Sequence, residues 1–115
     1  MSERSFLGEF EQMVLAAALR LEEQAYGARI IQEIEAITGR RVSGGSLYVT
    51  LNRLEDKGLL ESRMGDPEPG RGGRPKRYVR LTAAGLEALQ EARDAMLSLW
   101  DGLEERLERP DPSPS

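Results

Sequence analysis

The fold is decided by the stretch SGGSLYVTLNRLEDKG, residues 43–58. Leu47, Leu51 and Leu54 recur at the spacing i, i+4, i+7, which is typical of one apolar face of an α-helix. A serine stands where an N-cap is expected, and Gly58 follows the last apolar residue, where helices often end on a glycine. We therefore expect a helix from Ser43 to Lys57 with one buried and one exposed face.

Two further helical patterns precede this stretch, at about residues 7–21 and 26–38. The second carries Ile30 and Ile34 on one face and is followed by Gly39, a typical C-terminal cap. The first is apolar over a wide face, as expected of a well-buried helix. The chain thus begins with three consecutive helices.

A hairpin pattern follows the third helix. Residues 59–64 and 76–81 alternate or carry β-forming side chains, whereas Gly65–Pro75 contains four glycines and three prolines and is expected to be a loop. Three helices followed by a hairpin form the winged variant of the helix-turn-helix. The predicted fold class is mainly α with a small β-hairpin, in which the loop Gly65–Pro75 forms the wing.

A long last helix is expected from Thr82, its N-cap, to about Arg109, because Pro110 then ends the pattern. Its seam has no evident partner within one winged helix and predicts dimerisation, with Phe10 of the first helix joining the interface. Gly102 either permits close approach of a partner helix or marks a weak helix end. The seam residues have heptad-like spacing: Leu86, Leu89, Arg93, Met96, Trp100, Leu103 and Leu107.

These patterns divide the chain into three parts. Residues 1–81 form the predicted winged helix-turn-helix domain, 82–109 the C-terminal dimerisation helix of the same unit, and 110–115 a disordered tail. With 115 residues the chain is long enough for one domain with a real core and too short for two.

Local charge points to nucleic acid, although the net charge of the chain is −4. The segment from Arg40 to Arg80 holds ten Lys or Arg residues and only five Asp or Glu residues, which leaves it at +5. This segment contains both the predicted third helix and the wing. In a helix-turn-helix, the helix in the position of the third one enters the major groove of DNA.

Ten residues are predicted to contact DNA, six in the third helix and four in or beside the wing. The small residues that open the helix would let its backbone approach a phosphate, but they also suit ordinary capping. Tyr48 can equally be a boundary-packing residue, and the wing a solvated loop, since Asp66 and Glu68 fit DNA poorly. The ten are Ser43, Gly44, Ser46, Tyr48, Val49, Arg53, Arg71, Arg74, Lys76 and Arg77.

Several other classes of function are disfavoured by composition. The chain has no histidine and no cysteine, which removes the commonest general base, the thiolate nucleophile and the commonest metal ligands. We expect no enzyme activity, no metal and no cofactor. No apolar run approaches membrane-spanning length and no signal peptide is evident, so a cytoplasmic protein is predicted.

Trp100 is the chain's only tryptophan and lies on the seam of the last helix. One interpretation is an anchor of the dimer interface, where tryptophan is often a hot spot. The other is that Trp100 and Met96 line a pocket between subunits for a small aromatic effector.

Five short motifs together resemble the PadR family of bacterial transcription regulators. The resemblance covers about residues 7–107 and implies a homodimeric winged helix, usually a repressor, of the short subgroup with a single C-terminal helix. It also implies that Tyr48 and Arg53 in the third helix, and Arg74, Lys76 and Arg77 in the wing, lie at DNA; Gly44 departs from the bulkier residue common there. The motifs are Leu7-Gly8-Glu9-Phe10-Glu11, Ala25-Tyr26-Gly27, Ser43-x-Gly45-x-x-Tyr48-x-x-Leu51-x-Arg53-Leu54-Glu55-x-x-Gly58-Leu59, Gly72-Gly73-Arg74-x-Lys76-Arg77-Tyr78 and Leu81-Thr82-x-x-Gly85.

The predicted function is therefore a homodimeric, sequence-specific regulator that binds a pseudo-palindromic operator in double-stranded DNA. The alternative is a winged helix used for protein–protein contact without sequence-specific DNA binding. Salt-sensitive binding to duplex DNA separates the two.

Overall fold

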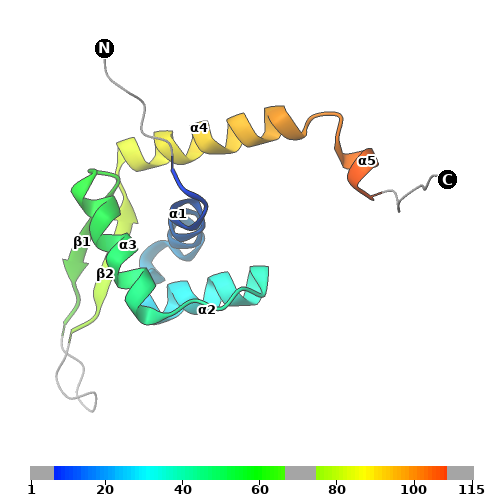
Figure 1. The fold of residues 1–115 in the computed structure, drawn as a ribbon. Helices are drawn as coiled ribbons and strands as arrows, with labels where there is room; N and C mark the ends of the chain where they lie inside the picture. The colour runs from blue at the N-terminus through cyan, green and yellow to red at the C-terminus, as the bar shows by residue number, and fades with distance from the viewer. Residues whose placement is uncertain (1–6, 67–74, 109–115) are drawn as a thin grey trace.

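Helices dominate the computed structural model, which describes residues 7–66 and 75–108. Figure 1 shows α1, α2 and α3 gathered on one side of a hairpin, with α4 crossing above α1. The elements in chain order are α1 (Glu9–Leu21), the short 3-10 helix η1 (Glu22–Gln24), α2 (Gly27–Thr38), α3 (Gly44–Asp56), β1 (Leu60–Met64), β2 (Arg77–Leu81), α4 (Ala83–Trp100) and α5 (Glu104–Glu108).

Local geometry confirms the predicted start of α3 and the predicted ends of α2 and α3. The Ser43 hydroxyl accepts a hydrogen bond from the backbone N–H of Ser46 at 3.1 Å, as an N-cap does. Gly39 closes α2 at φ +73°, and Gly58 follows α3 at φ +78°. Both glycines therefore occupy the left-handed conformation that ends helices with least strain.

The core forms where the apolar faces of the three helices meet. Leu47, Leu51 and Leu54 of α3 are buried against α1 and α2, whose Val14 and Ile30 are fully buried. The leucine spacing that predicted α3 therefore also predicted which of its faces is internal. The fold class expected from the sequence, mainly α with a small hairpin, is confirmed.

The two strands pair antiparallel, with Leu60 opposite Leu81 and Met64 opposite Arg77. The free edge of β2 is also partly covered, because the Val79 N–H donates to the carbonyl oxygen of Ala25 at 2.9 Å. An isolated bridge joins the neighbouring Tyr26 to β2. The hairpin is thus attached to the junction between α1 and α2.

The last helix differs from the prediction, which had it running unbroken to about Arg109. Instead α4 ends at Trp100, a turn follows, and the separate short helix α5 begins at Glu104. The physical reason is Gly102, which adopts φ +84°, a conformation that cannot continue a right-handed helix. Gly102 thus marks a helix end here. Arg109 and the predicted tail lie outside the described residues.

The start of α4 packs on the body and its remainder does not. Near its start, Gly85 is buried and Leu89 is half-buried against the core, in contact with α1 and β2. From Arg93 to Glu108 every residue is exposed. In Figure 1 the second half of α4 extends away from the three-helix body, and α5 lies beyond its end. Within residues 7–66 and 75–108, no helix combines the length and the apolar character needed to cross a membrane.

Candidate nucleic-acid interface

The outer face of α3 is open to solvent. Tyr48 and Val49 are 59% and 54% exposed, although the leucines on the other side of the same helix are buried. Arg53, one turn further along, is also exposed. A helix that shows a tyrosine, a valine and an arginine on one free face has the composition of a groove-contacting surface.

The first turn of α3 is exposed and small. Ser43, Gly44, Gly45 and Ser46 all lie at the surface. A Cβ atom added at either glycine would meet no other atom within 4 Å, so no packing contact in this chain requires glycine there. Capping accounts for Ser43, which bonds to the N–H of Ser46, but not for the two glycines.

The wing itself falls largely outside the described residues, and with it Arg71 and Arg74. Its base is defined by the backbone bond from Gly65 N–H to the Lys76 carbonyl oxygen, at 2.7 Å. Here Lys76 places its ammonium 4.2 Å from the ring centroid of Tyr26. Arg63 lies over the ring of Tyr78, and the two tyrosine rings meet edge to face at 5.4 Å. Cation–π contacts thus order the root of the wing.

Arg77, predicted as a DNA contact, points back to α3. Its guanidinium donates to Asn52 Oδ1 at 3.0 Å, to Glu55 Oε1 at 2.5 Å and to Ser62 Oγ at 3.1 Å. The hydrogen bond from Ser62 and that from Arg77 together hold the pKa of Glu55 below its ordinary value, because both favour the charged carboxylate. Arg77 is therefore part of a network inside the protein.

Sequence reasoning did not identify the partners of this network: Asn52, Glu55 and Ser62. Asn52 and Glu55 are three residues apart and therefore share one face of a helix. This spacing could have indicated a pair of side chains that bind a common partner. What the sequence does not reveal is that this face lies against the hairpin. Sequence reasoning also left out of the predicted DNA contacts Arg41, an exposed arginine three residues before α3 begins.

The predicted dimer residues fall into two groups. Phe10 and Leu89 are half-buried and pack against this chain's own core. The others, Leu86, Arg93, Met96, Trp100, Leu103 and Leu107, are exposed on α4, the following turn and α5. Leu97 and Leu99, absent from the predicted seam, are exposed as well, at 58% and 71%. The apolar surface of α4 is thus wider than a single heptad seam.

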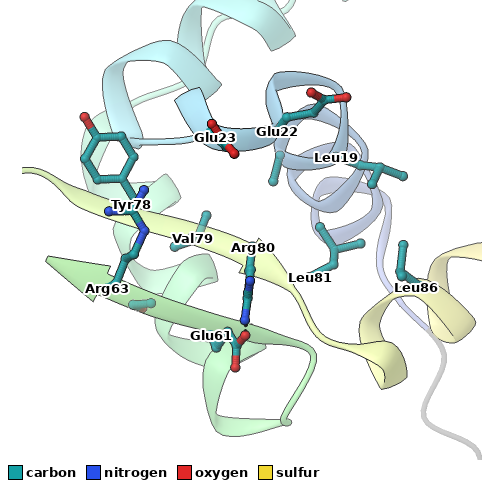
Figure 2. Close-up of a pocket in the computed structure, with 12 residues that line it drawn as sticks. Leu19, Glu22, Glu23, Glu61, Arg63, Tyr78, Val79, Arg80, Leu81 and Leu86 are labelled. Carbon is teal, nitrogen blue, oxygen red and sulfur yellow. Dashed lines mark hydrogen bonds and ion pairs between the residues drawn. The ribbon is translucent and has the colours of Figure 1, made fainter. Parts of the chain in front are cut away.

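An open pocket of about 610 Å³ lies between the hairpin, η1, the end of α1 and the start of α4. Figure 2 shows Arg63 and Tyr78 at one end, the Glu61–Arg80 ion pair on the hairpin, and Leu19, Leu81 and Leu86 at the other end. Trp100 and Met96, predicted to line an effector site, do not border this pocket.

Comparison with known proteins identifies the family. Residues 14–91 match the model of the Transcriptional regulator PadR-like family. The chain belongs to this family. It is therefore a DNA-binding transcription regulator with a winged helix, in a family of regulators and not of enzymes.

Individual relatives agree with this assignment. The PadR-like chain is 44% identical over 80 residues to Transcriptional regulator Rv3488 of Mycobacterium tuberculosis, covering 68% of each. A PadR family regulator from Eggerthella lenta is similar in structure, with a TM-score of 0.66, 32% identity, and coverage of 86% of this chain and 81% of that one. A PadR family regulator from Clostridium difficile, at 19% identity, shares the fold with a TM-score of 0.69, covering 87% and 99%.

Proposed function

We propose that this PadR-like protein is a homodimer that binds a pseudo-palindromic operator in double-stranded DNA and acts as a repressor in the bacterial cytoplasm, on the nucleoid. In this proposal α3 enters the major groove, with Ser43, Gly44, Ser46, Tyr48, Val49 and Arg53 at its DNA-facing side. The wing contacts the adjacent phosphate backbone or minor groove through Arg71, Arg74 and Lys76.

The observation that carries the proposal is the contrast between the two faces of α3. One face is anchored in the core by leucines, while the other exposes Tyr48 and Val49 by more than half. The described chain leaves most of both side chains uncovered. Burying them against base edges, where valine can contact a thymine methyl group, would remove apolar area from water.

Dimerisation is supported by the exposed apolar residues of α4. Met96, Leu97, Leu99 and Trp100 are each at least 41% exposed, so this part of the helix lacks a partner within the described chain. A second copy related by two-fold symmetry would cover it and would present a second α3. Two such helices reach half-sites about 34–36 Å apart, one turn of DNA.

The proposal also includes a site for a small aromatic effector at the dimer interface. Met96 and Trp100 are four residues apart on α4 and are therefore neighbours on one helical face. A flat aromatic ligand held between these residues of two protomers would compete with the packing of the dimer and release the DNA. Quenching of Trp100 fluorescence on titration with aromatic compounds tests this part directly.

The first experiment is selection of bound fragments from random duplex DNA, followed by titration of the best fragment at several salt concentrations. We expect an inverted repeat, and an affinity that falls steeply as salt rises. Arg74→Ala/Lys76→Ala should weaken binding to all duplexes and flatten the salt dependence. Arg20→Ala, which removes a surface arginine paired with Glu33 on the α1–α2 side, is the matched control.

Two results would overturn the proposal. Failure of the folded, dimeric protein to enrich any duplex at low salt would favour the protein-interaction alternative. Sedimentation of the wild-type protein as a monomer at micromolar concentration would remove the dimer. For the interface itself, Trp100→Ala should raise the dimer dissociation constant at least tenfold, since tryptophans at interfaces often contribute about 2 kcal/mol or more.

A further inference from the structure

Arg77 uses all three nitrogens of its guanidinium within the protein. Nη1 donates to Asn52, Nη2 to Glu55 and Nε to Ser62, at 3.0, 2.5 and 3.1 Å. The Ser62 hydroxyl in turn donates to the same Glu55 oxygen at 2.6 Å, which closes a ring of hydrogen bonds. The Arg77 side chain is only 23% exposed. Its charge is thus already compensated by an adjacent carboxylate.

These hydrogen bonds join three elements that lie apart in the sequence. Asn52 and Glu55 lie on α3, Ser62 lies on β1, and Arg77 begins β2 at the root of the wing. The guanidinium also lies 5.7 Å from the ring centroid of Tyr48, one of the exposed residues of α3. One side chain therefore connects the DNA-facing helix to both strands that carry the wing.

We propose that Arg77 is a positioning residue that sets the placement of the wing relative to α3, and not a phosphate contact. This inference rests on the proposed function, because a fixed placement matters only if both elements engage one duplex. A guanidinium that turned to a phosphate would weaken its bonds to Glu55, Asn52 and Ser62, and the hairpin would lose these side-chain links to α3. A planar, three-nitrogen donor suits this task better than a lysine.

The same hairpin offers a matched control. Arg80 on β2 pairs with Glu61 on β1, directly opposite in the strand register. The side chains of Arg80 and Glu61 are 78% and 50% exposed. Figure 2 shows that this ion pair joins the two strands of the hairpin to each other. Glu61→Gln and Glu55→Gln each remove one negative charge at or beside the hairpin, so both change long-range attraction to DNA similarly. Only Glu55→Gln removes the carboxylate that binds Arg77.

The experiment measures operator affinity against salt concentration for Glu55→Gln, Arg77→Lys, Arg77→Ala and Glu61→Gln. We expect Glu55→Gln and Arg77→Lys to weaken binding about fivefold, Arg77→Ala to weaken it about tenfold, and Glu61→Gln to leave it within twofold. The slope of log affinity against log salt should stay at the wild-type value in all four, because each variant keeps every side chain that binds a phosphate.

The opposite pattern would overturn the inference. If Glu55 merely restrains a phosphate-binding arginine, Glu55→Gln will bind more tightly with a steeper slope. Arg77→Ala will then flatten the slope by about 0.9 for each phosphate that the protein no longer neutralises. Arg77→Lys, which retains the charge, will in that case bind nearly as well as wild type.

A DNA-free readout separates this inference from simple loss of fold. Hydrogen exchange of the Gly65 amide, which bonds to Lys76 at the root of the wing, should accelerate in Glu55→Gln and not in Glu61→Gln, at equal melting temperatures. Equal exchange in both variants would sink the inference while the proposed function stands. A wild-type protein that binds no duplex would overturn both, and this is seen before any variant is made.

Discussion

The first turns of α3 and α4 are built alike but differ in what surrounds their glycines. Each starts with a capping hydroxyl: Ser43 accepts from Ser46 N–H at 3.1 Å, and Thr82 accepts from Gly85 N–H at 3.0 Å. Each first turn also contains glycine. At Gly85 an added Cβ would lie 2.1 Å from the backbone oxygen of Leu59, whereas at Gly44 and Gly45 it would meet nothing within 4 Å.

The difference separates two reasons for a glycine. In α4 the glycine is required by the protein's own packing, because the chain after α3 passes directly against it. In α3 two glycines weaken the helix by up to about 1 kcal/mol each, and no contact in the described chain compensates. A cost without an internal reason points to an external partner that approaches the backbone closely, which fits the proposed DNA contact.

The largest expected effect is on stability, from Gly85→Ala. The new Cβ would overlap a backbone oxygen, which cannot rotate away as a side chain can. We expect a decrease of about 3 kcal/mol in the free energy of unfolding, measured by urea denaturation. Gly44→Ala is the matched control and should show no decrease; an equal decrease in both would erase the contrast.

The next largest effect is on stability, from removing the two capping hydroxyls. Thr82→Ala removes the bond to Gly85 and a second one, since the Thr82 hydroxyl also donates to the Gly58 carbonyl oxygen at 2.7 Å. We expect a destabilisation of about 2 kcal/mol for Thr82→Ala and about 1 kcal/mol for Ser43→Ala in thermal unfolding. Only Ser43→Ala should also weaken operator binding. Weaker DNA binding by a fully folded Thr82→Ala variant would contradict the comparison.

Gly44→Ala also sharpens the comparison by moving stability and binding in opposite directions. The substitution should stabilise the free protein by about 0.5 kcal/mol or more, because alanine favours helix and finds open space. Operator affinity should fall about tenfold, equivalent to about 1.4 kcal/mol, if the added methyl group keeps the backbone from a phosphate. Unchanged affinity would leave the two glycines without a functional reason.

The smallest expected effect is a change in stability with pH. It concerns the C-terminal end of α3, where an ion pair joins it to α1. Lys57 Nζ donates to the buried Glu11 at 2.9 Å. Burial raises the pKa of Glu11, but the N–H of Gly8 and the Lys57 ammonium outweigh it, so the pKa lies below the ordinary value of 4.5. The resulting stability is therefore complete above about pH 4.5 and is lost as pH falls through the lower, folded-state pKa.

Unfolding measured between pH 3 and pH 6, with Glu11→Gln beside the wild type, tests this linkage. The wild type should lose more stability on acidification than the variant does. Glu9→Gln, which alters a neighbouring glutamate whose side chain is 75% exposed, should follow the wild type. If the stability of the wild type and of Glu11→Gln changes with pH in parallel, the ionised Glu11 carboxylate does not contribute to the stability.

Much of the fold was predictable because periodicity and capping are local. The leucines of α3 and the glycines at positions 39 and 58 defined the helices before any coordinates. The helix break at Gly102 could not be decided from the sequence, since helix propensity alone does not distinguish a glycine that a helix tolerates from one that ends it. Arg77 shows a different limit. A basic residue beside a wing indicates a DNA contact by composition, while its three partners lie 15–25 residues away and are brought together only by folding.

The hydrogen bond from Val79 to Ala25 has a consequence for the order of folding. The two residues are separated by more than fifty positions, so this bond closes a long loop. Loop closure costs entropy that only prior local structure can offset. We therefore expect the helices to form and dock first and the hairpin to gain protection last. In pulse-labelling experiments during refolding, the root of the wing should be the latest region to become native.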